Sequence, residues 1–171
     1  MKFIYRGKVA WKFGDFVPGD AILGRVGMHE KDPEKTKNYV LTAYDPDFPR
    51  KFNKGDLMIA GRHFGGTRDH GGMRALKTLG VSCMVAESFS RPILRRCINE
   101  NAFPVLECPG ISGFANKDDE MEVNLRTGKI KNLTTGKTIT AQPAPEIQLE
   151  ILKVGEFIPY LRKKLETENR I

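Results

Sequence analysis

Three short apolar runs, separated by segments of helical periodicity, dominate the middle of the chain. The runs read LMIAG from residue 57, VSCMVA from residue 81 and FPVLEC from residue 103. Between them, residues 71–79 and 90–99 place apolar side chains three and four positions apart, which is typical of a helix with one buried face. Ser90 stands where it can cap the second helix, and Pro92 falls in its first turn. This alternation of strands and helices predicts parallel strands joined by crossover helices.

The flanking segments carry different patterns. Residues 2–12 alternate between polar and apolar positions, which predicts a first strand. Residues 26–40 are polar and predict a loop that leads into a weak helix, whereas residues 44–56 read as irregular. The later runs MEVNL, KIKNL and KTITA are separated by Thr-Gly pairs, which predicts hairpins. Two amphipathic helices are predicted at residues 146–153 and 157–165, and the charged tail from about residue 163 is expected to fray.

Together these elements predict a single α/β domain over residues 1–171, with a mainly parallel sheet, helices and added β-hairpins. A chain of 171 residues is long enough to bury a proper core in one domain. No apolar run approaches the roughly 20 residues needed to cross a membrane, and the N-terminus lacks the apolar stretch of a secretory signal. We therefore expect a cytoplasmic protein without a membrane partner.

Charge and cysteine usage narrow the chemistry. The formal net charge of +7 suits an anionic metabolite, a nucleic acid or an acidic partner protein. Acidic residues are interspersed with the basic ones, which makes a nucleic acid the less favoured partner. Cys83, Cys97 and Cys108 are odd in number, lie in apolar contexts and show no C-x-x-C spacing. They are interpreted as buried structural thiols, so we expect no metal or iron–sulfur site on this chain.

The segment GRHFGGTRDHGG, residues 61–72, joins a buried strand to a helix and is the strongest candidate for a binding site. Its glycines permit close backbone approach, so several N–H groups can converge on one ligand. The dipole of the following helix and the guanidinium of Arg68 both favour an anion. The alternative is a glycine-rich turn in which Arg68 pairs with Asp69. His63 and His70 have no third ligand at suitable spacing and are interpreted as hydrogen-bonding loop residues.

The stretch from GDLMIAGRHFGGTRDH to SFSRPILRRCINENAF resembles the small subunit of 3-isopropylmalate dehydratase and the swivelling domain of aconitase. The family pattern contains an F-G-x-G-S-S-R-E-H loop, then A-L-K-x-x-G, then an S-F-x-R element followed by I-N. Asp20 and Ile22 also keep the places of the family's opening T-D-x-I element. The resemblance covers nearly the whole chain, and it implies a swivelling-type β/β/α domain.

This resemblance also implies a function, that of one chain of a two-chain hydro-lyase such as the enzyme of leucine biosynthesis. In such enzymes the large subunit holds a [4Fe-4S] cluster whose open iron acts as a Lewis acid on the leaving hydroxyl. The small subunit closes over a 2-hydroxy dicarboxylate or tricarboxylate. We therefore expect this chain to hold no cofactor, to need the large subunit for activity and to contact the substrate. A paralogue for homoaconitate or a methylated malate, and a non-catalytic module that binds anions or nucleic acid, are the alternatives.

The candidate loop is shorter than the family's. Matching Arg68, Asp69 and His70 to R-E-H puts Gly66 at the catalytic serine, whereas matching the following helix first puts Thr67 there. The two alignments disagree on the base, and an altered or lost activity stays open. A threonine hydroxyl has the hydrogen-bonding capacity of serine. The resemblance assigns the candidate roles as follows: Thr67 as catalytic base; Arg68, Arg25, Gly65, Gly66 and His70 as substrate-binding residues; Val26, Gly27, Met28 and His29 as the specificity loop.

Overall fold

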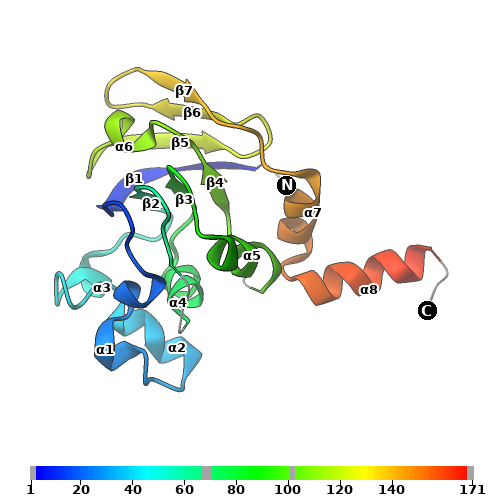
Figure 1. Ribbon diagram of the computed structural model, residues 1–171, viewed down its shortest axis with the longest axis horizontal. Helices are drawn as coiled ribbons and strands as arrows, with labels where there is room; N and C mark the ends of the chain where they lie inside the picture. Colours follow the sequence, from blue (N-terminus) through cyan, green and yellow to red (C-terminus); the bar gives the residue numbers. More distant parts are fainter. Residues whose placement is uncertain (1–2, 67–70, 101–102, 169–171) are drawn as a thin grey trace.

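The computed structural model describes residues 3–66, 71–100 and 103–168. Strands in this part of the chain form one seven-stranded sheet in the order β4-β3-β2-β1-β5-β6-β7 (Figure 1). The α/β class predicted from the alternating pattern is therefore confirmed. The strands are β1 Ile4–Lys12, β2 Leu57–Ala60, β3 Met84–Ala86, β4 Val105–Glu107, β5 Glu120–Asn124, β6 Lys129–Asn132 and β7 Thr138–Thr140.

Strand β1 lies at the centre of the sheet and separates two kinds of pairing. On one side, β1, β2, β3 and β4 are parallel, and Val9 of β1 lies opposite Leu57 of β2. On the other side, β5, β6 and β7 are antiparallel, and Tyr5 of β1 lies opposite Val123 of β5. The predicted hairpins thus form and extend the same sheet beyond β1, where the sequence alone suggested an added β layer.

Helices α4 and α5 make the two predicted crossovers between parallel strands, and α8 extends away from the sheet (Figure 1). The longest described helix, α8, has 11 residues, and no helix in the described ranges has the length and apolar character of a membrane span. The helices are η1 Gly19–Ile22, α1 Gly24–Gly27, α2 Pro33–Thr36, η2 Lys37–Tyr39, α3 Phe48–Lys51, α4 Gly72–Leu79, α5 Arg91–Asn99, α6 Ile111–Phe114, α7 Glu146–Val154 and α8 Phe157–Thr167.

Both faces of the parallel half of the sheet are buried. Successive side chains of β2 point to opposite faces, so Leu57 and Ile59 enter one apolar cluster with β5, β6 and α7. Met58 and Ala60 enter a second cluster with η1, α4 and α5. Burial on both faces explains why β2 reads as a continuous apolar run and not as an alternating one.

The loop and weak helix predicted for residues 26–40 are confirmed, because α1 ends at Gly27 and the short helices α2 and η2 begin only at Pro33. Three other local predictions are wrong. Residues 44–56 contain the turn α3, which forms because Phe48 is buried against the core. Helix α8 continues to Thr167, so the charged residues from 163 to 167 belong to a helix. Ser90 precedes α5 as predicted, but its side chain makes no cap hydrogen bond within the described chain.

Candidate functional site

The candidate site lies where three neighbouring parallel strands end. Beyond β1, β2 and β3, residues 13–19, 61–66 and 87–90 continue side by side and keep exchanging backbone hydrogen bonds. Phe13 N–H donates to Ile59 O at 2.8 Å, and Phe64 N–H donates to Ser88 O at 3.0 Å. Ser90 N–H in turn donates to Phe64 O at 2.9 Å. The candidate loop therefore leaves a fixed, hydrogen-bonded edge at the carboxyl end of β2, which is where ligands bind in open α/β sheets.

Gly65 is a structural part of this edge. Its N–H donates to Val17 O at 2.8 Å, and its carbonyl accepts from Gly19 N–H at 2.9 Å. Its φ of +102° lies in the left-handed region, and a Cβ at this position would overlap Ile93 of α5. The Gly65 amide is used within the protein, so Gly65 shapes the loop and does not offer its N–H to a ligand. This corrects the expectation for Gly65, whereas the amides of the other loop glycines stay a prediction.

The loop itself is anchored by two more glycines. Gly66 has φ +56° and faces Pro18, and Gly71 has φ +94° directly before α4. Gly71 O accepts the N–H of Ala75 at 2.9 Å, so the first turn of α4 begins at the end of the loop. The amino end of α4, with its partial positive charge, therefore adjoins the loop. The predicted residues Thr67, Arg68 and His70 lie between these anchors, outside the described residues.

The specificity segment begins at the same place. Gly19, which donates to Gly65, opens η1, and η1 runs into α1. Arg25 and His29 are exposed, and Val26 is 71% exposed. Gly27 is buried, and a Cβ added there would lie only 2.6 Å from the Cβ of Tyr39, so the position has no room for a side chain. Met28 packs against the core.

The segment thus divides into two groups. Arg25, Val26 and His29 are on the surface, and Gly27 and Met28 are held inward. Asp20 of η1 keeps the place of the aspartate in the family's opening T-D-x-I element. It is half-buried and has an interaction partner. The three surface residues are the most accessible for direct contact with a ligand, and a role for the half-buried Met28 stays a prediction.

Sequence reasoning missed an ion pair at the edge of the site. Both Nε and Nη2 of Arg62 donate to Asp15 Oδ2, at 2.9 and 2.7 Å, and Arg62 N–H donates to Asp15 Oδ1 at 2.7 Å. The backbone hydrogen bond first, and the guanidinium second, hold the pKa of Asp15 below its usual range. The two residues are 47 positions apart, so no local pattern signals this pair.

The three cysteines are free and buried. Burial raises the pKa of the Cys83 thiol, and burial followed by the negative charge of Glu87 raises the pKa of Cys108 to about 11. Protonated thiols are poor ligands, because the thiolate is the metal-binding form. Among the described residues, no group of three His, Cys, Asp or Glu side chains is arranged to hold a metal ion.

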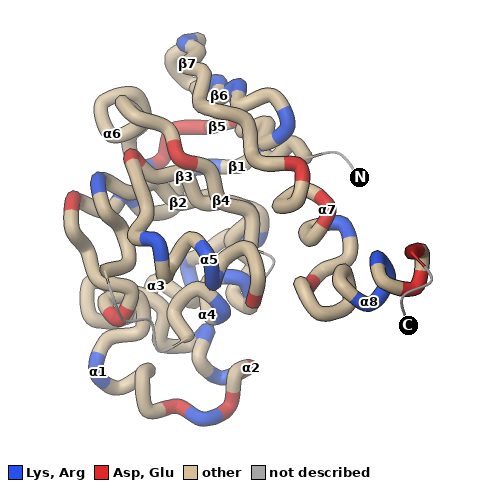
Figure 2. The backbone as a smooth tube through the Cα atoms, turned by 45° about the vertical axis from the view of Figure 1, so that its right-hand side comes forward, with Lys and Arg blue, Asp and Glu red and all other residues tan. Residues whose placement is uncertain are grey.

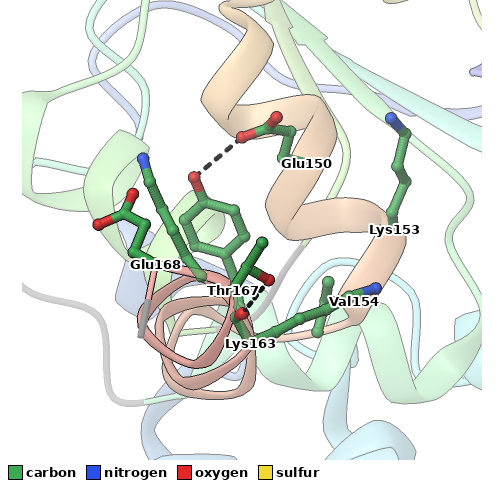
Figure 3. Close-up of a pocket in the computed structure, with 8 residues that line it drawn as sticks. Glu150, Lys153, Val154, Lys163, Thr167 and Glu168 are labelled. Carbon is green, nitrogen blue, oxygen red and sulfur yellow. Dashed lines mark hydrogen bonds between the residues drawn. The ribbon is translucent and has the colours of Figure 1, made fainter. Parts of the chain in front are cut away.

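A pocket of about 350 Å³ lies elsewhere, between α7 and α8 (Figure 3). Tyr160 donates to Glu150 Oε2 at 2.9 Å, and this hydrogen bond raises the pKa of Tyr160. Lys153, Lys163 and Lys164 also line this pocket, so its charges are of both signs. Figure 2 shows the same mixture along α2 and α8, where basic and acidic residues lie close together. The pocket contains none of the predicted site residues.

The chain matches known proteins over nearly its full length. No family model matches the chain. It is 46% identical over 167 residues to the isopropylmalate/citramalate isomerase small subunit of Methanocaldococcus jannaschii, covering 96% of this chain and 98% of the relative. It is 36% identical over 166 residues to 3-isopropylmalate dehydratase small subunit 1 of Methanopyrus kandleri, covering 96% of each.

A solved structure agrees with these sequence relatives. The crystal structure of a 3-isopropylmalate dehydratase from Methanocaldococcus jannaschii superposes with a TM-score of 0.84 at 28% identity and covers 98% of both chains. The class defined by the fold and by these relatives is thus that of dehydratase small subunits with a mixed α/β sheet. The chain belongs to the 3-isopropylmalate dehydratase small-subunit family.

Proposed function

We propose that this chain is the small subunit of a two-chain hydro-lyase, and that its loop 66–71 binds a carboxylate of a 2-hydroxy dicarboxylate or tricarboxylate. The observation that carries this proposal is the position of the loop. It leaves the carboxyl end of β2, between the continuations of β1 and β3, and ends at the amino end of α4. A substrate carboxylate at that point is stabilised by the helix dipole.

Two arginines are proposed to hold the substrate's carboxylates. Arg68 belongs to the loop, and Arg25 is exposed on α1, which is connected through η1 to the edge at Gly65. A guanidinium binds a carboxylate through two parallel hydrogen bonds, which fixes orientation as well as position. Gly66 and His70 are proposed to complete this carboxylate site.

The proton is proposed to move to Thr67. The Thr67 side-chain oxygen, as the oxyanion, takes the proton from the substrate carbon next to the carboxylate. The electron pair of that C–H bond then forms the double bond as the substrate's own hydroxyl group leaves. A carbon acid of this kind is very weak, so the base works only where positive charge stabilises the developing anion. Arg68 and the amino end of α4 supply that charge in this proposal.

The cluster is proposed to belong to a large subunit. The three cysteines of this chain are buried, and among the described residues they belong to no group of metal ligands, whereas a [4Fe-4S] cluster is held by several cysteine thiolates. When bound on the partner, the cluster supplies a Lewis acid for the leaving hydroxyl. The role of this chain is then to orient the carboxylates, exclude water and accept the proton. We propose that this assembly works in the cytoplasm, where cysteines stay reduced.

The substrate is proposed to be isopropylmalate, with citramalate as the second candidate. Citramalate is included because this chain is 46% identical to a relative that is named for both compounds. Isopropylmalate and citramalate differ in an apolar group, so the side chains that read this group are expected on the exposed part of α1. Val26 and His29 are proposed for that role.

Assembly and turnover together test this function. The chain is produced with a cluster-bearing large subunit of this family, and the complex is reconstituted without oxygen. Dehydration of isopropylmalate and of citramalate, and hydration of homoaconitate, are then assayed. Turnover of the first or second compound supports the proposal. A stable complex without turnover of any 2-hydroxy acid contradicts it and leaves the non-catalytic module as the better description.

Two variants of the complex test the assigned roles. Thr67→Ala is expected to lower kcat by at least about 10³-fold, whereas Arg68→Lys is expected mainly to raise KM. Thr67→Ser is the matched control, because it keeps the hydroxyl and removes only a methyl group. If Thr67→Ala turns over like the wild type, another group is the base.

A further inference from the structure

Two exposed turns stand beside the candidate site, and each contains a non-glycine residue with positive φ. Phe16 has φ +56° and His63 has φ +51°, two of the four non-glycine residues with positive φ in the described chain. Histidine adopts this conformation comparatively often, but for a bulky phenylalanine it is a genuine outlier, and such strain persists only where the surroundings impose it. Residues of this kind gather at binding sites, which makes the two turns a candidate contact surface.

The two turns hold each other in place. Phe16 N–H donates to Arg62 O at 2.7 Å, and the backbone and guanidinium of Arg62 bind the Asp15 carboxylate on both sides. His63 N–H donates to Ser88 Oγ at 2.9 Å. The N–H groups of Phe16, Arg62 and His63 therefore all donate within the protein, and these hydrogen bonds hold the backbone of both turns in place.

These constraints keep aromatic side chains at the surface. Phe16 is 66% exposed, its ring centroid lies 6.1 Å from that of His63, and the Arg62 guanidinium lies 6.0 Å from the Phe16 ring centroid. We call Phe16, Arg62 and His63 the aromatic rim. An exposed phenylalanine held in a strained conformation beside an arginine has the composition of an interface anchor, since aromatic residues and arginine are enriched at protein interfaces.

The rim is continuous with the candidate site. Pro18 and Gly65 form a parallel bridge, and each lies two residues from a member of the rim. A chain that covers the edge at Pro18 and Gly65 therefore lies next to the rim. Among possible occupants, this continuity favours the chain that completes the site over a second copy of this one.

We propose that the aromatic rim is a docking surface for the cluster-bearing large subunit, and that Phe16 inserts into an apolar hollow on that partner. The inference rests on the proposed function, because it takes the large subunit as the chain that covers the site. Arg62, already paired with Asp15, contributes its planar face and stem beside Phe16 and leaves no unpaired charge when the surface is covered.

The test separates docking from folding. Phe16→Asn removes the ring but keeps the turn, because asparagine tolerates positive φ. The dissociation constant of the full-length chain for the purified large subunit is measured by calorimetry, with thermal unfolding of the chain alone as the folding control. We expect Phe16→Asn to raise Kd by about 10- to 100-fold and to leave the unfolding temperature unchanged or higher. Ile158→Asn on α8, where Ile158 is 58% exposed, is the matched control and is expected to stay within about 2-fold.

Each outcome decides the inference. If Phe16→Asn and Phe16→Gly both bind like the wild type while the wild-type complex turns over isopropylmalate, the rim is not the docking surface and the proposed function stands. If the wild-type chain does not bind the large subunit, both fail. If the variants change sedimentation of the chain alone and not Kd for the large subunit, the rim is a contact between copies and the inference is overturned.

Discussion

Gly65 and Ile93 lie so close that a single methyl group on the glycine would overlap the isoleucine side chain. This contact presses the edge of the candidate site against α5, the helix that follows β3. The backbone of Gly65 is also paired with Val17 and Gly19, so the position is fixed on both sides. The edge from which the loop departs is therefore rigid.

Gly65→Ala is expected to destabilise the protein by about 2–5 kcal/mol, because it adds both an overlap in the core and a strained φ. Gly71→Ala is the matched control: it also has positive φ, but nothing lies within 4 Å of an added Cβ. It is expected to cost only about 1–2 kcal/mol. Urea unfolding of both variants measures the difference, and equal losses would mean that the contact with Ile93 is unimportant.

The ion pair between Asp15 and Arg62 predicts a pH dependence. The pKa of Asp15 is lowered in the folded protein, so its contribution to stability is present above the pKa of an unfolded aspartate and is lost as the pH falls through the folded pKa. Asp15→Asn should therefore unfold at a lower temperature than the wild type between pH 5 and 8, and the gap should close below about pH 4. Thermal unfolding across this range is the measurement. A gap that widens in acid would show that the carboxylate does not stabilise these turns.

The buried thiols should be unreactive in the native chain. Thiolate is the reactive form, and burial raises the pKa of Cys83 while that of Cys108 stands at about 11. At pH 8 we expect labelling by a disulfide reagent to follow global unfolding and to reach all three cysteines only in denaturant. Rapid labelling of Cys83 or Cys108 without denaturant would contradict this arrangement, and mass spectrometry of the labelled chain identifies which cysteine reacts.

Val26 provides a prediction about substrate choice. It is 71% exposed on α1 and is proposed to contact the apolar group in which isopropylmalate and citramalate differ. In the assembled enzyme, Val26→Ala is expected to change the ratio of the two kcat/KM values by about 5- to 20-fold, in favour of the compound that fills the enlarged space. Ile147→Ala, at an exposed position on α7, is the control. An unchanged ratio would remove Val26 from the specificity segment.

The crossover elements were predictable because their signals are local. Apolar positions three and four apart placed α4 and α5, and continuous apolar runs placed β2, β3 and β4. Glycine before a helix and proline in its first turn also marked the boundaries to within one residue, since α5 begins at Arg91. The same local pattern placed the segment 61–72 between a strand and a helix, as observed at its two ends.

Other features depend on residues that are distant in the sequence. The turn α3 forms because Phe48 is buried, and the Ser90 hydroxyl is buried without a hydrogen-bond partner among the described residues instead of capping α5. The role of Gly65 depends on Val17 and on Ile93, neither of which a local pattern connects to it. Tertiary contacts override local preference at these places, and two of them, Gly65 and Ser90, lie at the edge of the site.

The central position of β1 has a consequence for biosynthesis of the protein. This strand leaves the ribosome before both of its neighbours, β2 and β5, and β5 ends only at Asn124. At usual translation rates of about 5–20 residues per second, the first strand waits roughly 5–20 seconds before both of its edges are covered. During that interval the unpaired edges of β1 can form strand pairs with other nascent chains. We therefore expect production of this polypeptide to depend on chaperones that bind and cover β1.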